Sequence, residues 1–237
     1  MSKIVIYKAI FGDYDNKPKP PPKGFDKNTS FVLLTDKEIS IEGWETIKIN
    51  KYSPVLNNRS CKMFPWKYFD AQKSLYLDGH IEFGDEFIEF YTELISKDYV
   101  FAVNRHRAKG NVSDELIRCI DNSKITKNEI KKIFDSDLII DAPAVECGMI
   151  FRNHENDNIK IQADRWWWYF NNICPRDQIS VHTAARDADI SITILESDFS
   201  NTNFFKIIGH KNWFFKIIKA RLKIILRVFF SGLLIDD

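Results

Sequence analysis

The chain has few of the features that mark a secreted, disulfide-bonded or membrane-spanning protein. Its four cysteines include no CxxC pair and no compact Cys/His cluster, which disfavours both a disulfide framework and a structural zinc site. No run of about 18 apolar residues occurs, as a transmembrane helix would need. Residues 1–3 lead directly into a β-rich stretch instead of the apolar core of a signal peptide. We therefore expect reduced thiols and a cytoplasmic location.

An excess of charge of one sign is also lacking. The 34 lysines and arginines almost balance the 33 acidic residues, so the net charge is +1 and no global field attracts a nucleic acid. We expect no nucleic-acid partner. The 237 residues are 44% hydrophobic and 28% charged, which suits one folded α/β domain, with at most an appendage. The oligomeric state cannot be read from these values.

Short apolar stretches that end in polar residues alternate with segments of helical spacing. We expect strands at residues 4–10, 30–35, 44–49, 73–77, 99–103, 145–151 and 190–195. Helices are expected at residues 85–95, 113–120, 127–134, 158–172 and 176–185, with a mixture of helix and turn over 57–69. This order predicts an α/β fold, with a mixed sheet flanked by helices and ligand-binding loops at one edge. The domain is expected over residues 1–203.

The fourth expected strand ends abruptly at Asp78 and Gly79. A carboxylate at the end of a central strand can hold a divalent cation that bridges the phosphates of a nucleotide sugar. A glycine after it lets the backbone approach a ligand. The usual motif is Asp-x-Asp, but the third position here is His80, which suits Mn²⁺ better than Mg²⁺. An ordinary strand-to-turn Asp-Gly explains the same residues.

Other residues in the first half could complete a nucleotide-sugar site. Arg59 and Lys62 lie three positions apart and could meet a diphosphate on one helix face, although a solvated basic patch is the simpler alternative. Asp36 follows the second strand, where it could bind a base or ribose or merely cap a turn. The first strand and its turn are expected to seat the base and ribose through Tyr7, Ala9, Phe11, Gly12 and Tyr14.

Aromatic and charged residues of the second half point to a sugar site. Trp166, Trp167 and Trp168 cannot all face a core, because neighbours on a helix are about 100° apart. One of them could stack on a sugar, or the three could serve core packing and contact with a membrane. Asp177 could be a general base for an acceptor hydroxyl, bind sugar hydroxyls, or complement a helix dipole. His210, near the C-terminus, could be a metal ligand or an ordinary surface residue.

An ordered set of motifs runs along the chain. It consists of Ile6-Tyr7-Lys8-Ala9-Ile10-Phe11-Gly12-Asp13-Tyr14-Asp15, Arg59-x-x-Lys62, Pro65, Ser74-Leu75-Tyr76-Leu77-Asp78-Gly79-His80-Ile81, His106-Arg107, Glu146-x-Gly148-x-x-x-Arg152-x-His154, Trp167 and Arg176-Asp177-Gln178. This set resembles the plant turgor-regulation-defect and mucilage-related glycosyltransferases, a family that includes bacterial surface-polysaccharide proteins. The resemblance covers roughly residues 3–186. Members of that family commonly carry Asn or Lys at the position of His80.

The resemblance implies a GT-A-like fold and the transfer of a hexose from a nucleotide sugar, with a UDP-sugar favoured, to a glycan or glycolipid acceptor. It implies that the residues around the donor sugar and acceptor are Asp177, Glu146 and Gln178. It places at the acceptor site His106, Arg152, His154 and Trp167. The expected ligands of a Mn²⁺ or Mg²⁺ ion are Asp78, His80 and His210.

Two other functions fit the same motifs. The missing second aspartate of Asp-x-Asp is compatible with a non-catalytic nucleotide- or carbohydrate-binding protein that keeps the fold. A nucleotide-sugar hydrolase or a nucleotidyltransferase would use a similar site. Release of nucleotide from a panel of nucleotide sugars separates these functions.

Residues 204–237 differ in composition from the rest. They combine apolar residues with lysine and arginine at helical spacing, and no acidic residue occurs before Asp236. A helix of this kind lies in the membrane interface with its basic residues near anionic headgroups. The alternative is a helix that packs on its own domain or on a second subunit. We expect peripheral attachment to the inner face of a membrane, because the basic residues between 216 and 227 disfavour a membrane span.

Overall fold

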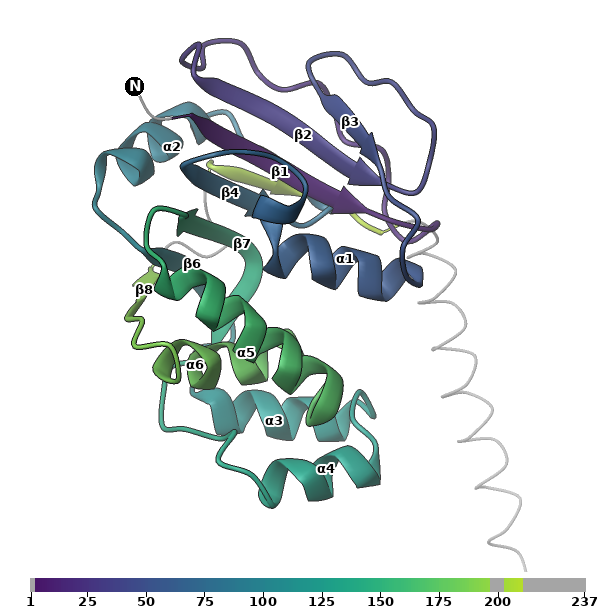
Figure 1. Ribbon diagram of the computed structural model, residues 1–237, viewed down its shortest axis with the longest axis vertical. Helices are drawn as coiled ribbons and strands as arrows, with labels where there is room; N and C mark the ends of the chain where they lie inside the picture. The colour runs from purple at the N-terminus through teal and green to yellow at the C-terminus, as the bar shows by residue number, and fades with distance from the viewer. Residues whose placement is uncertain (1–2, 197–202, 211–237) are drawn as a thin grey trace, which may run out of the picture.

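A seven-stranded sheet forms the centre of the protein. The computed structural model describes residues 3–196 and 203–210. The sheet has the strand order β3-β2-β1-β4-β7-β6-β8 (Figure 1). These strands are β1 (Ile4–Ile10), β2 (Thr29–Thr35), β3 (Glu45–Lys48), β4 (Lys73–Leu77), β6 (Phe101–Arg105), β7 (Val145–Asn153) and β8 (Ile192–Leu195). Only β7 runs antiparallel to its neighbours in this sheet. The predicted α/β class, a mixed sheet flanked by helices, is confirmed.

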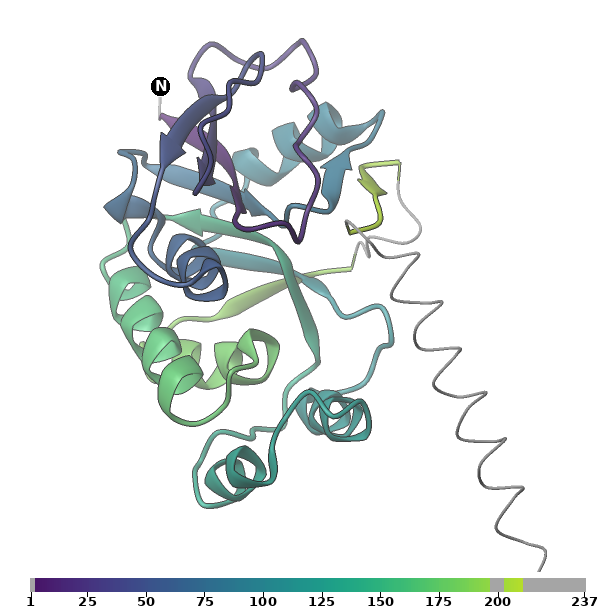
Figure 2. The same cartoon turned by 90° about the vertical axis from the view of Figure 1, so that its right-hand side faces the viewer.

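Helices cover both faces of the sheet. One face packs against α1 (Pro54–Met63), α5 (Asn158–Asn172) and α6 (Asp177–Arg186), and the other against α2 (Phe87–Ser96). The short helix η1 (Pro65–Lys67) follows α1, and α3 (Val112–Asp121) and α4 (Lys127–Phe134) pack beside α6. Figure 2 shows α3 and α4 beyond the end of the sheet. The helices predicted between residues 57 and 185 are all present.

Strand β1 is buried along its whole length because its side chains point alternately to the two faces of the sheet and helices cover both. On one face, Val5, Tyr7 and Ala9 pack toward helices α1, α5 and α6. On the other face, Ile4 and Ile6 pack toward α2. A central strand covered on both faces reads as a continuous apolar run, as observed here.

Lys8 is the exception in β1, because its ammonium lies in the interior. It contacts the backbone oxygen of Ile81 and forms a 2.9 Å ion pair with Glu82 Oε1. The two side chains are 0% and 3% exposed. This pair fastens the start of strand β5 (Ile81–Phe83) beneath the sheet, immediately after His80.

A second, two-stranded sheet joins distant parts of the chain. Strand β5 pairs in antiparallel fashion with β9 (Phe205–Ile207), and the Ile208 amide donates to the backbone oxygen of His80 over 2.9 Å. The helical spacing predicted from residue 204 therefore does not describe residues 205–207, which form a strand. The remainder of the predicted amphipathic segment, residues 211–237, lies outside the described residues. Among those described, no helix is long and apolar enough to cross a membrane.

Strand direction decides which polar residues meet. Strands β1 and β4 are parallel and in register at Tyr7 and Tyr76, so the turns that follow them lie at the same edge of the sheet. Strand β7 brings its first residues to this edge, where the amide of Asp78 donates to the Gly148 oxygen over 2.7 Å. The later residues of β7 pair with the beginning of β4, at the opposite end.

Candidate functional site

Two adjoining pockets lie at the edge where β1 and β4 end. The first, here the β1–α1 pocket, has a volume of about 360 Å³ and is lined by residues that include Tyr14, Asp15, Arg59, Arg176 and His210. The second, here the β6–β7 pocket, has a volume of about 280 Å³ and is lined by residues that include His106, Arg107, Glu115, Glu146 and Gln178. Asp78 and His80 line both pockets, so they form the boundary between them.

Asp78 is held in place from three directions. Its Oδ1 accepts a 2.6 Å hydrogen bond from the Tyr76 hydroxyl and lies 3.8 Å from Lys62 Nζ. Its backbone amide is bound by β7, as described above. The side chain stays 25% exposed at the pocket boundary. Asp78 thus lies where the two pockets meet, and its role at a nucleotide-sugar site stays a prediction.

Lys62 and Asp177 form a buried ion pair beneath the pockets. Lys62 Nζ lies 2.6 Å from Asp177 Oδ2, and the two side chains are 2% and 7% exposed. Burial alone would raise the pKa of Asp177, but the charges of Arg59 and Lys62, with the hydrogen bond from Lys62, hold that pKa well below its usual range. Such a carboxylate is a poor proton acceptor. Neither residue lines either pocket, which corrects the expectation that Lys62 contacts a diphosphate and that Asp177 acts as a base.

Asp15, His80 and His210 form a group that could hold a metal ion. One ligand atom of each lies within 4.8 Å of the others, and Asp15 Oδ1 is 2.5 Å from His210 Nδ1. The rings of His80 and His210 have centroids 4.7 Å apart. Two of the predicted ligands therefore meet, but the carboxylate that joins them is Asp15, while Asp78 lies outside the group. Sequence reasoning does not single out Asp15, because this residue lies in the turn after the first strand. The parallel pairing of β1 with β4 is the signal that could have found it, since it brings the turns after both strands to one edge of the sheet.

Gly79 is required by the approach of Asp15. A Cβ atom at this position would lie 2.8 Å from Asp15 Cγ and 2.9 Å from Asp15 Cβ, closer than real side chains come. We expected this glycine to let a ligand approach the backbone. The structure shows instead that it makes room for a carboxylate of the candidate metal group.

The chemistry of this donor set suits a transition-metal ion. Metal–ligand bonds of about 2.1 Å place two ligand atoms at most about 4.2 Å apart. Small rotations of the side chains would therefore bring the three ligand atoms onto one ion. One carboxylate and two imidazoles favour Mn²⁺ or a later divalent metal over Mg²⁺, which prefers oxygen ligands.

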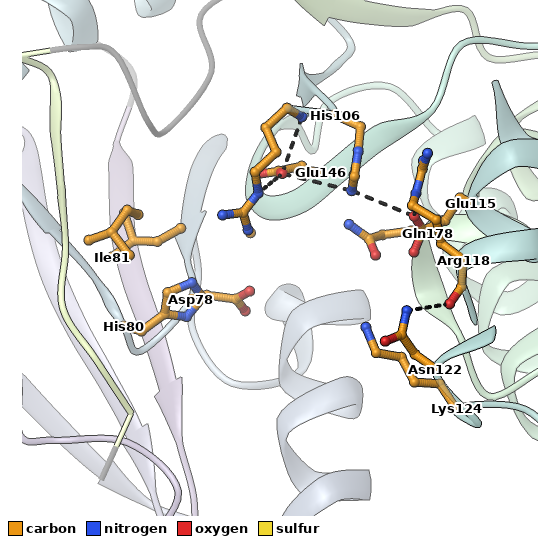
Figure 3. Close-up of a pocket in the computed structure, with 13 residues that line it drawn as sticks. Asp78, His80, Ile81, His106, Glu115, Arg118, Asn122, Lys124, Glu146 and Gln178 are labelled. Atoms are coloured by element: carbon orange, nitrogen blue, oxygen red, sulfur yellow. Dashed lines mark hydrogen bonds and ion pairs between the residues drawn. The ribbon is translucent and has the colours of Figure 1, made fainter. Parts of the chain in front are cut away.

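A network of charged side chains lines the β6–β7 pocket (Figure 3). Arg107 Nε donates to Glu146 Oε1 over 2.9 Å, and Arg118 Nε donates to Glu115 Oε2 over 3.0 Å. His106 lies between the two carboxylates, with Nε2 at 3.6 Å from Glu115 and 3.9 Å from Glu146. Burial lowers the pKa of His106, and the two carboxylates oppose this effect. Its Nδ1 accepts from a backbone amide, which places the proton of the neutral ring on Nε2, toward the carboxylates.

Three of the residues that the resemblance assigned around the sugars come together here. Glu146, His106 and Gln178 all line the β6–β7 pocket, and Figure 3 shows them opposite Asp78 and His80. Their side chains come from β7, the segment after β6, and α6. The arrangement can hold a hydroxylated ligand next to a carboxylate.

The other residues predicted for the acceptor lie elsewhere. Arg152 is fully buried, with its guanidinium over the rings of Phe101 and Trp166. His154 bonds Ser74 Oγ over 2.8 Å at the opposite end of the sheet, and Trp167 packs against the ring of Phe64. None of the three lines either pocket, because β7 and α5 carry them away from the edge where Asp78 lies. This corrects their expected contact with an acceptor.

The residues expected to seat the base and ribose divide into two groups. Phe11 and Tyr14 line the β1–α1 pocket, whereas Tyr7 and Ala9 are fully buried in the core. Gly12 has a φ of +61° and donates its amide to Asp36 Oδ2 over 2.8 Å. Asp36 thus caps the turn after β1, in agreement with the structural alternative for this residue.

Three solved structures are similar to this chain, each with a TM-score below 0.5. No protein-family model and no curated protein matches the sequence. The 4-diphosphocytidyl-2C-methyl-D-erythritol synthase of Anaerococcus prevotii DSM 20548 is similar with 10% identity and a TM-score of 0.47, over 93% of this chain and 95% of that chain. Galactosyltransferase LgtC, in complex with donor and acceptor sugar analogues, is similar with 12% identity and a TM-score of 0.43, over 80% of this chain and 72% of that one.

A further similar structure is the glycosyltransferase GlyE of Streptococcus pneumoniae TIGR4. It has 14% identity and a TM-score of 0.44, and the match covers 82% of this chain and 46% of that chain. Membership of the turgor-regulation-defect family stays a prediction from the ordered motifs.

Proposed function

We propose that this protein is a glycosyltransferase that moves a hexose from a nucleotide sugar to a hydroxyl group of a glycan. The donor that we favour is a UDP-sugar. One observation carries the proposal: two pockets adjoin at Asp78 and His80, with a candidate metal group in one and a buried carboxylate in the other. A transferase must hold its donor and acceptor in contact while the sugar changes partners. Two pockets with a shared boundary meet this requirement.

The β1–α1 pocket would take the nucleotide diphosphate. Asp15, His80 and His210 would hold a divalent cation there, and the cation would act as a Lewis acid on the leaving phosphate. Tyr14, which is 54% exposed, lies with its ring 4.3 Å from that of His210 and offers a flat surface at the pocket mouth. Arg59 offers a positive charge to the diphosphate.

The β6–β7 pocket would take the acceptor. Glu146 would accept the proton of the acceptor hydroxyl, because its carboxylate lines the pocket and Asp177 is committed to its ion pair. Gln178 can donate and accept hydrogen bonds to sugar hydroxyls. Arg107 would orient Glu146, because its backbone amide and its Nε both donate to Glu146 Oε1.

Nucleotide release tests this function directly. The full chain is incubated with Mn²⁺, a panel of nucleotide sugars and mixed glycan acceptors, and free nucleoside diphosphate is measured. Transfer requires release that depends on both donor and acceptor and that Asp78→Ala and Glu146→Gln each reduce strongly. Binding of UDP without release from any donor would identify a non-catalytic nucleotide-binding protein. Release that ignores the acceptor would identify a hydrolase.

The acceptor that we favour is a surface polysaccharide or a lipid-linked glycan at the cytoplasmic face of a membrane. The composition of residues 211–237, which is apolar and basic until Asp236, supports this choice. Flotation with anionic liposomes tests it, using the full chain and a chain that ends at His210. The truncation must lie after His210, because β9 and this histidine belong to the folded body. Equal flotation of both chains would refute membrane attachment through this segment.

A further inference from the structure

Arg176 lines the β1–α1 pocket. The sequence places it in the motif Arg176-Asp177-Gln178, but only the other two residues of that motif were expected at the site. Arg176 immediately precedes helix α6, and Arg59 reaches the same pocket from helix α1. The Nε atoms of both arginines are buried without a hydrogen-bond partner among the described residues, although Arg59 Nε lies 3.7 Å from Asp177 Oδ2 in an ion pair. An unsatisfied buried guanidinium nitrogen is costly, and a bound anion would satisfy it.

The backbone around Arg176 is fixed. The Asp177 oxygen accepts a 3.0 Å hydrogen bond from Trp166 Nε1, and the Arg176 oxygen accepts one of 3.2 Å from the Ile179 amide. Both arginines act on Tyr14: burial is the largest cause that raises the pKa of Tyr14, and the charges of Arg59 and Arg176 oppose it. Tyr14, Arg59 and Arg176 all line this pocket.

The charge balance of this region favours an anion once a metal is bound. The cations Arg59, Lys62 and Arg176 are matched by the carboxylates Asp15, Asp78 and Asp177, and Lys62 is already paired with Asp177. A divalent cation on the candidate metal group would leave the pocket positive. A diphosphate would restore the balance.

We propose that Arg59 and Arg176 form a diphosphate clamp in the β1–α1 pocket, in which Arg176 takes the place that the sequence assigned to Lys62. Each planar guanidinium presents paired N–H donors that match phosphate oxygens. The clamp acts on the diphosphate from the helix side and does not need the metal. That the ligand carries a nucleoside rests on the proposed function. That it carries a diphosphate anion rests on the two arginines alone.

Isothermal titration of the full chain in EDTA tests the clamp. The titrants are inorganic pyrophosphate, UDP and uridine, and the proteins are the wild type, Arg59→Gln, Arg176→Gln and the control Arg165→Gln. Arg165 is an exposed residue of α5 that lines neither pocket. We expect each clamp variant to bind pyrophosphate and UDP about tenfold to a hundredfold more weakly, the range for a lost hydrogen bond to a charged group. The control should match the wild type, and uridine should bind all four proteins equally.

The variant Arg176→Lys separates a loss of binding from a folding defect. It keeps the charge but loses the forked donors, so it should keep the wild-type melting temperature and still bind pyrophosphate more weakly. The clamp is refuted if Arg176→Gln binds pyrophosphate like the wild type, if the wild type binds neither pyrophosphate nor UDP in EDTA, or if the control loses as much affinity. A clamp that behaves as expected in a protein that transfers no sugar would refute the proposed function only. Sugar transfer with normal binding by Arg176→Gln would refute the clamp only.

Discussion

Replacing Gly79 by alanine should remove the metal site while leaving the fold intact. The added Cβ would lie 2.8 Å from Asp15 Cγ, whereas carbon atoms in contact are about 3.5–4.0 Å apart. The carboxylate must therefore retreat by roughly 0.7–1.2 Å, by the same contact distance. Metal–ligand distances tolerate deviations of only about 0.2 Å. Asp15 should be lost as a ligand in the Gly79→Ala protein.

The cost to folding should be small by comparison. Gly79 is not among the residues with positive φ, so alanine fits its backbone. The atoms that must move belong to a side chain, and a side chain forced off its rotamer costs about 0.5–1.5 kcal/mol. Mn²⁺ affinity should fall by at least about tenfold, since even the loss of an outer-shell partner of a metal ligand costs this much.

The assay is titration of Mn²⁺, followed by electron paramagnetic resonance, without nucleotide. It compares Gly79→Ala, Asp15→Ala, the double variant and the control Asp13→Ala, whose carboxylate is 83% exposed in the same turn. If Gly79 acts through Asp15, the double variant binds Mn²⁺ no more weakly than Asp15→Ala does. Wild-type affinity in Gly79→Ala, or additive losses in the double variant, would refute the reasoning.

Three further changes test the buried charges. Asp177→Asn removes the nearer of the two carboxylates at the buried Lys62 and should lower the free energy of unfolding by about 3–5 kcal/mol in urea titrations at pH 7. Because the folded pKa of Asp177 is depressed, its contribution is complete above the unfolded pKa of about 3.9 and is lost as the pH falls toward the folded value. The wild type should thus lose stability on acidification more steeply than Asp177→Asn, and parallel curves would contradict this. Lys8→Met should lower the free energy of unfolding by a similar amount, because it leaves Glu82 buried without this cation. The double variant Lys8→Met with Glu82→Leu should regain most of that stability. A double variant no more stable than Lys8→Met would show that the ion pair is not the cause. Arg152→Met should leave the KM for the acceptor unchanged and the melting temperature equal or higher, because burial lowers the pKa of this arginine and its removal relieves an internal charge; a large rise in that KM would restore Arg152 to the site.

The long elements could be predicted because their own residues determine them. Strand β1 is apolar except at Lys8, and helix α5 occupies the predicted residues 158–172. The short strands β5 and β9 could not, since three residues carry no period. In β9 the sequence Phe-Lys-Ile fits a helix as well as a strand, and only the pairing with residues 81–83 decides between them.

The site was predictable as far as strand ends determine it. Asp78 and His80 follow a central strand, and that position places them at the pocket boundary. The depth of a helix residue was not predictable from spacing. Arg59 and Lys62 are three residues apart on α1, yet Lys62 lies against the ring of Tyr76 and is only 2% exposed. The second arginine of the pocket is Arg176, which comes from the start of α6.

The pairing of β5 with β9 determines when, during synthesis, the candidate metal group can form. All strands of the seven-stranded sheet have been made once Leu195 is in place, but His210 follows 15 residues later and lies 195 residues beyond Asp15. At about 5–20 residues per second, roughly 10–40 seconds separate the synthesis of these two ligands. A nascent chain held with its last residues in the ribosome can therefore complete its sheet while it still lacks the third ligand. Proteolytic removal of residues 203–210 would return a finished molecule to that state, with its sheet intact and its cation group open.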